Sequence, residues 1–185
     1  MRSAVLAVLE YLVGFLALAW FAYLAFGRGN PTDASFVAAF KASSVLAAVE
    51  LGLLLARKSP ANRLIVGANL WLLAGGAAAY LQQWWWLRVY QQFGEASLFL
   101  TMLIVGVVST VASPAGFIGK HGPSLSVKRA SLLLLAAVGG ALVAAVVFRG
   151  NVKWAAVVPV IALSWLCRWL RYRVPELAPQ GGPAQ

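Results

Sequence analysis

The stretch that decides the fold is residues 63–90, RLIVGANLWLLAGGAAAYLQQWWWLRVY. It begins with a positive charge, carries an amide, Asn69, inside an apolar run, and contains the pair Gly75-Gly76. It ends in a polar and aromatic block, QQWWW, at residues 82–86. Because tryptophan is enriched at membrane–water interfaces, this pattern predicts a membrane-spanning helix whose second end lies at an interface.

The composition of the whole chain supports the same class. Of 185 residues, 62% are hydrophobic and only 11% are charged, whereas a soluble domain has about 45–50% apolar and about 25% charged residues. This excess implies that the outer surface is apolar as well as the core, which is typical of a bilayer protein. We therefore predict an all-α, polytopic membrane helix bundle.

Six apolar runs separated by turn residues predict six transmembrane helices. The first run is too long for the hydrophobic region of a signal peptide, so we expect an uncleaved first helix. The predicted spans form one domain over residues 1–173 and cover residues 4–26, 34–56, 64–87, 96–112, 130–148 and 154–172. Residues 174–185, which include three prolines and two glycines, predict a disordered cytoplasmic tail.

The loop charges predict the orientation of these spans. With six spans, ten basic residues fall on the side of the two termini and four on the other side, with Lys41 inside a span and not counted. Positive residues favour the cytoplasmic side, so both termini are expected to face the cytoplasm. The alanine- and leucine-rich composition and short loops favour the plasma (inner) membrane of a bacterium.

Several functional classes are disfavoured by what the sequence contains. The net charge is +10, and the basic residues cluster between the apolar runs. This position favours contacts with the lipid bilayer over contacts with nucleic acid. One cysteine and one histidine cannot form a metal or haem site, so no metal and no cofactor is expected. The sequence has no phosphate-binding loop, nucleophile elbow or zinc-protease motif.

Three polar residues inside the predicted spans are the strongest candidates for a site. Glu10, Glu50 and Asn69 each lie six residues from the predicted cytoplasmic end of their helix, which places all three about 9 Å below that boundary. Ionisable groups at such depth usually face the bundle interior and have partners. The three residues predict either a proton or cation site or a hydrogen-bonded joint that holds the helices together.

Other polar residues define two more candidate regions. Near the outer side, possible polar contacts involve Lys41, Gln82, Gln83 and Glu95. On the cytoplasmic side, a lipid headgroup or partner contact is the hypothesis for Lys120, His121, Lys128 and Arg129, with a plain topogenic loop as the alternative.

The run 130–148 carries two faces of small residues at four-residue spacing. One face comprises Ala136, Gly140 and Ala144, and the other Ala137, Ala141 and Ala145. Such faces allow close approach of a second membrane helix, either within the bundle, from another membrane protein or in a homo-oligomer.

Three functions follow from these features. The first is a non-enzymatic accessory, scaffold or partner-binding membrane subunit, which fits the lack of catalytic motifs. The second is a small proton- or cation-linked transporter or channel that uses Glu10, Glu50 and Asn69. The third is a lipid-modifying membrane enzyme, which ranks last because the sequence supplies no nucleophile or metal set.

Overall fold

A computed structural model describes residues 14–27, 32–56 and 61–175, and every regular element in these ranges is helical. Three segments are long and apolar enough to cross a membrane, namely Asp33–Ala56, Ser124–Val147 and Lys153–Arg173. The elements are α2 (Leu16–Phe26), α3 (Asp33–Ala56), α4 (Arg63–Tyr80), α5 (Trp84–Phe93), α6 (Ala96–Ala112), α7 (Ser124–Val147), the π-helical turn η1 (Lys153–Val157) and α8 (Val158–Arg173).

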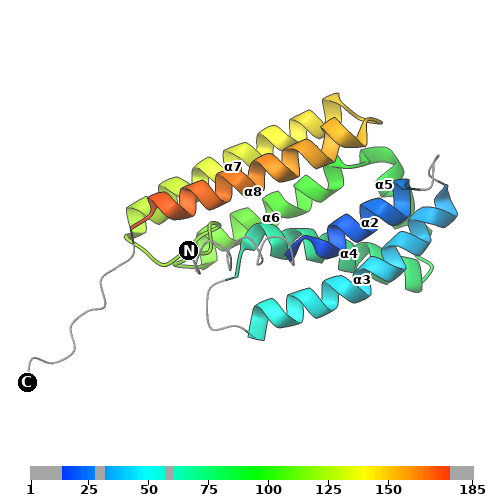
Figure 1. The fold of residues 1–185 in the computed structure, drawn as a ribbon, viewed down its shortest axis with the longest axis horizontal. Coiled ribbons are helices and arrows are strands. Elements are labelled where there is room, and N and C mark those ends of the chain that lie inside the picture. Colours follow the sequence, from blue (N-terminus) through cyan, green and yellow to red (C-terminus); the bar gives the residue numbers. More distant parts are fainter. Residues whose placement is uncertain (1–13, 28–31, 57–60, 176–185) are drawn as a thin grey trace, which may run out of the picture.

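The long helices run side by side along the long axis of the molecule (Figure 1). α7 and α8 form one flank and α3 the opposite flank, with α4 and α6 between them. α2 packs on α3 and touches α4, and α4 and α6 join the two halves. Short α5 lies at one end of the bundle, and the chain leaves α8 at the other end.

Several helices match the sequence-based ranges closely. α6 begins at Ala96 and ends at Ala112, as the run 96–112 predicts, and α3 begins one residue before the run 34–56. α7 begins at Ser124, six residues before the predicted residue 130, because Pro123 marks the start of the helix and the polar residues after it continue the helix. Residues 176–185 of the predicted tail lie outside the described ranges, but Val174 is buried.

The stretch 64–87 is not one helix, which corrects the prediction. α4 ends at Tyr80, and Gln82 has a φ of 55°, a backbone conformation that an α-helix cannot contain. The amide of Leu81 donates to the carbonyl of Ala77 at 2.9 Å, and the amide of Gln83 donates to that of Ala78 at 2.8 Å. These bonds satisfy two of the four carbonyl groups in the last turn of α4, and α5 starts as a separate helix.

The predicted helix 4–26 is also interrupted where the structure describes it. α2 begins only at Leu16, and Phe15 before it has φ −109° and ψ 10°, outside the helical region. Residues 4–13 of the predicted span lie outside the described ranges. The interruption matters because it gives α2 its own N-terminus inside the bundle.

Gly75 and Gly76 let α3 and α4 approach each other closely. A Cβ atom on Gly75 would collide with the ring of Phe40, and one on Gly76 would collide with the side chain of Ser44. Aromatic rings fill the space beside these two glycines. Phe40 contacts Phe21, Trp71 and Tyr90, with ring centroids 4.6, 5.2 and 5.9 Å away. This cluster fills the bundle on the side where α5 lies.

Candidate functional site

The carboxyl group of Glu50 lies in the contact between α3 and the start of α2. Its side chain is buried, and Oε1 accepts a hydrogen bond of 2.9 Å from the backbone amide of Ala17. Ala17 is the second residue of α2, so its amide has no carbonyl partner within that helix. Glu50 therefore caps a helix that is 33 positions away in sequence.

Asn69 of α4 is the second member of this group. Its side chain is buried and interacts with the Glu50 carboxyl. Within the described residues, however, neither Asn69 Oδ1 nor Nδ2 makes a hydrogen bond of good geometry, and Glu50 Oε2 makes none. The predicted neighbourhood of Glu50 and Asn69 is thus present, while Glu10 lies outside the described residues.

Chemically, this pair joins three helices and keeps unused hydrogen-bonding capacity. The bond from Ala17 ties α2 to α3, and Asn69 brings α4 to the same point. Burying a polar atom without a partner is unfavourable by about 1–3 kcal/mol. A proton on the carboxyl or a small polar guest would use the free atoms, whereas the bond to Ala17 serves structure alone.

Lys41 does not meet the polar residues that the sequence suggests as its partners. Its ammonium group lies 5.4 Å from the centroid of the Tyr80 ring, and the Tyr80 hydroxyl donates to the Lys41 carbonyl at 3.2 Å. Gln82 and Gln83 are exposed at the break after α4. Glu95 lines a separate cavity. A cation–π contact with Tyr80 thus replaces the predicted polar cluster.

The four candidates for a lipid headgroup or partner contact divide into one partly buried residue and three exposed residues. Lys120 Nζ donates to the carbonyl groups of Arg171 and Val174 at 2.9 and 2.8 Å, which satisfies the C-terminal end of α8. The side chain of Arg171 returns a bond of 3.3 Å to the Gly119 carbonyl. Lys120 therefore has a structural role, while His121, Lys128 and Arg129 are exposed and accessible to lipid headgroups or a partner.

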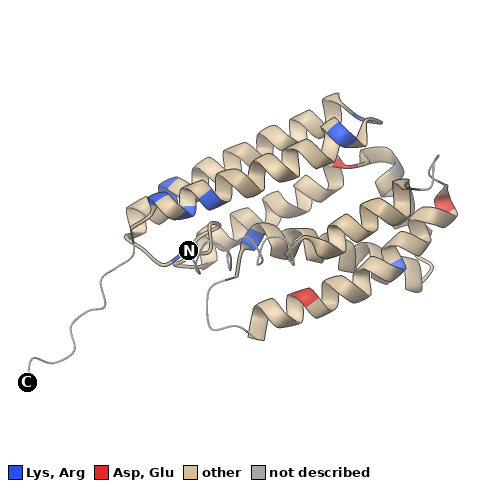
Figure 2. Cartoon of the chain, in the orientation of Figure 1, with Lys and Arg blue, Asp and Glu red and all other residues tan. Residues whose placement is uncertain are grey.

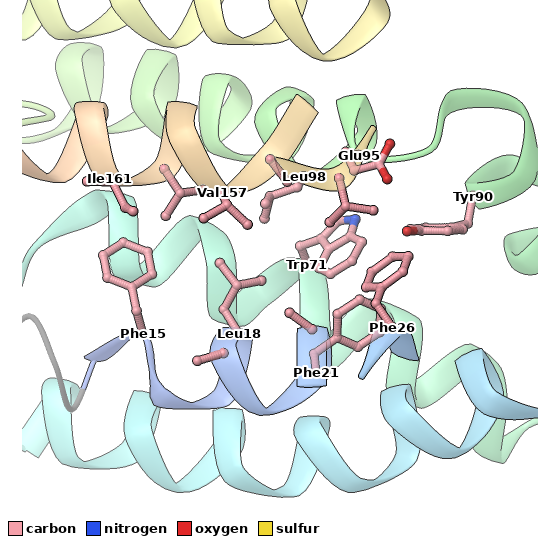
Figure 3. A pocket seen from close by; sticks show the side chains of 15 residues that line it. Phe15, Leu18, Phe21, Phe26, Trp71, Tyr90, Glu95, Leu98, Val157 and Ile161 are labelled. Carbon is pink, nitrogen blue, oxygen red and sulfur yellow. The ribbon is translucent and has the colours of Figure 1, made fainter. Parts of the chain in front are cut away.

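A cavity of about 330 Å³ separates α2 from η1 and α8 (Figure 3). Its lining comes from α2, from Trp71 of α4, from the start of α6 and from the segment that follows α7. Almost all of the lining is aliphatic or aromatic. The polar exceptions are the Trp71 indole, which already donates to Ser97 Oγ at 3.0 Å, the Tyr90 hydroxyl and the Glu95 carboxyl.

Tyr90 and Glu95 lie together at one end of this cavity, while Phe15 and Ile161 lie at the other (Figure 3). Burial and the negative charge of Glu95 both raise the pKa of the Tyr90 phenol, so it stays protonated and can donate a hydrogen bond. The carboxyl group of Glu95 makes no hydrogen bond or ion pair with any part of the chain that the structure describes. The cavity thus has an apolar body and an acidic end.

Several residues of these sites are not evident from the sequence. The Ala17 amide becomes available because α2 begins only at Leu16, and Gly14 before it is the sole local sign of this interruption within the described residues. Tyr90 closes the stretch 63–90 at its predicted interface end, but its side chain is buried against Phe36 and Phe40.

No group of three or more metal-ligating residues occurs within the described ranges. No family model, no curated protein and no solved structure matches this chain.

Proposed function

We propose that this protein is a non-enzymatic, multi-pass membrane subunit that acts by binding a transmembrane helix of a partner protein. In this proposal the chain crosses the inner membrane six times, with both termini in the cytoplasm. The distribution of charge supports the orientation, because basic residues gather where α8 ends (Figure 2). The three long apolar helices support the membrane location.

The outward face of α7 is the observation that carries the proposal. Ala141 and Ala145 are buried and face the rest of the bundle, whereas Ala136 and Gly140 are exposed. A Cβ atom on Gly140 would meet nothing within 4 Å. One of the two small-residue faces is therefore used inside the bundle, and the other is open to a further helix, which could approach to backbone contact.

Photo-cross-linking in native membranes tests this proposal. With a photoreactive residue at Val143, which is 62% exposed beside this face, we expect one predominant adduct. Gly140→Leu should lower the yield of that adduct at least about tenfold, because a leucine holds the two backbones apart. The readout is the adduct mass on a denaturing gel and by mass spectrometry.

Gly52→Leu is the matched control, since Gly52 lies in α3 and likewise has nothing within 4 Å of a built Cβ atom. It should leave the adduct at wild-type yield. An adduct with twice the mass of the chain would identify the partner helix as a second copy. The absence of an adduct, or an adduct insensitive to Gly140→Leu, would refute the proposal.

A second candidate function is a proton pathway through Glu50, and the unpartnered atoms of Glu50 and Asn69 favour it. If this candidate holds, proteoliposomes that contain the protein and a trapped pH-sensitive dye will conduct protons, and Glu50→Gln will abolish the flux. Asp33→Asn, at the exposed start of α3, should leave the flux unchanged. Equal flux through wild-type protein, Glu50→Gln and empty liposomes would exclude this function.

A further inference from the structure

The cavity between α2 and η1–α8 has the construction of a binding site for an amphiphile. Its volume of about 330 Å³ lies at the lower end of the range of small-molecule sites, roughly 300–1,000 Å³. Leu18, Phe21, Leu98 and Val160 are among the residues that wall it. Such walls suit a hydrocarbon chain and offer nothing to a polar solute.

The local backbone supports a site at this position. η1 is a π-helical turn that ends two residues before Pro159, and its residues Ala156 and Val157 line the cavity. Single π-helical turns are rare and occur often at functional sites. Small residues on both sides, Ala22 of α2 and Ala156 of η1, leave the space open.

The end formed by Tyr90 and Glu95 determines which headgroup fits. Glu95 offers a carboxylate without an ion-pair partner in the described part of the chain, and the Tyr90 hydroxyl lies beside it (Figure 3). A carboxylate in a mostly apolar cavity is matched best by a group that is positively charged and donates hydrogen bonds. Lys153, which is exposed, directly follows the lining residue Val152 and adds a positive charge to the segment before α8.

This arrangement complements a headgroup with an ammonium followed by a phosphate. The acidic end of the cavity also lies at the level expected for a headgroup. α5, whose residues Trp84 and Trp85 are each 53% exposed, lies at the same end of the bundle, and exposed tryptophans are typical of a membrane interface. An acyl chain would then run from this interface toward Phe15 and Ile161 (Figure 3).

We infer that the cavity between α2 and η1–α8 binds one acyl chain of a phospholipid whose headgroup carries a primary ammonium, with that ammonium paired to Glu95. This site is separate from the α7 face that carries the proposed function, so either can fail without the other.

Native mass spectrometry of the purified full chain tests the inference. Phosphatidylethanolamine and phosphatidylglycerol with identical acyl chains are added separately to the protein in detergent. We expect a one-to-one adduct with phosphatidylethanolamine at concentrations where phosphatidylglycerol binds at least about tenfold less. Glu95→Gln should weaken binding of phosphatidylethanolamine about tenfold, the effect of losing one charge-assisted bond, and leave phosphatidylglycerol unchanged.

Variants that fill the cavity test the location of the chain. Ala156→Phe should weaken binding of phosphatidylethanolamine at least about tenfold, while Ala162→Phe, on an exposed position of α8 outside the cavity, should bind like wild type. Ala22→Leu fills the cavity from α2 and serves if Ala156→Phe does not fold. Equal binding of both lipids to wild type, no effect of Glu95→Gln, or wild-type binding by the folded filling variants would each overturn the inference.

Discussion

Replacing Gly76 with leucine is expected to destabilise the protein by about 3 kcal/mol or more, the upper range for overpacking a core. Even a single Cβ atom at this position would collide with the Ser44 side chain and lie 3.2 Å from the Phe40 carbonyl oxygen. Ser44 is buried and donates to the Lys41 carbonyl at 3.0 Å. Neither neighbour can move unless α3 and α4 separate, which also exposes the aromatic cluster behind them.

The free energy of unfolding, measured in detergent by steric trapping, gives the size of this effect. Gly52→Leu is again the matched control, because the same change on an open face of α3 should alter the free energy by less than about 0.5 kcal/mol. A Gly76→Leu variant as stable as Gly52→Leu would show that α3 and α4 are not held at the distance described here.

Replacing Glu50 with leucine is expected to destabilise the protein by about 2 kcal/mol, because the Ala17 amide then loses its acceptor in a buried position. The variant should also show a local loss of protection at the start of α2, in addition to the lower free energy of unfolding. Hydrogen exchange at the Ala17 amide should accelerate before exchange in the centre of α3, since the start of α2 is what the carboxyl group holds.

Glu50→Gln separates the hydrogen bond from the charge. A glutamine keeps an oxygen in the position of Oε1, so we expect this variant to retain the free energy of unfolding within about 1 kcal/mol and to protect the Ala17 amide. Equal losses in the glutamine and leucine variants would show that the charge of Glu50, and not its bond to α2, stabilises the joint.

The parts of the fold that the sequence predicts well are those with local causes. α6 is bounded by Gly94, which has a φ of 54°, and by the Ser113-Pro114 pair, and both ends can be read without knowledge of the tertiary structure. α3 begins at Asp33, an acidic residue in the first turn, beside the Thr32–Ser35 hydrogen bonds. The helical, membrane-protein class likewise follows from composition and from the length of the hydrophobic runs, which are properties of the sequence alone.

The interruptions of two helices have causes that lie elsewhere in the chain. The stretch 64–87 has no proline, and Gln82 gives no indication that its φ is positive. The start of α2 depends on an acceptor supplied by Glu50 from another helix. The single glycine beside the first break, Gly14, does not locate it, because Gly52 and Gly67 lie inside continuous helices. The break at Gln82 has no glycine or proline beside it, so it cannot be located from sequence alone.

The candidate sites show the same division. Depth along each helix predicts that Glu50 and Asn69 lie at one level, because helical rise is regular, and the Asn69 side chain lies beside the Glu50 carboxyl. Depth also groups Lys41 with Glu95, but Lys41 lies on α3 and Glu95 directly before α6, and α4 packs between these two helices, so Lys41 meets Tyr80 instead. Which helices become neighbours is set by packing, and between α3 and α4 this packing depends on Gly75, Gly76 and the aromatic rings beside them.

The order in which the helices pack bears on how the chain assembles during synthesis. α2 packs on α3, α3 on α4, α4 on α6, α6 on α7, and α7 on η1 and α8. These main contacts join elements that follow one another along the chain, except that short α5 lies between α4 and α6. Low sequence separation of contacts favours rapid folding. A ribosome-bound intermediate that ends after α4 already contains Glu50, Ala17 and Asn69, and each later helix finds its docking surface complete when it emerges.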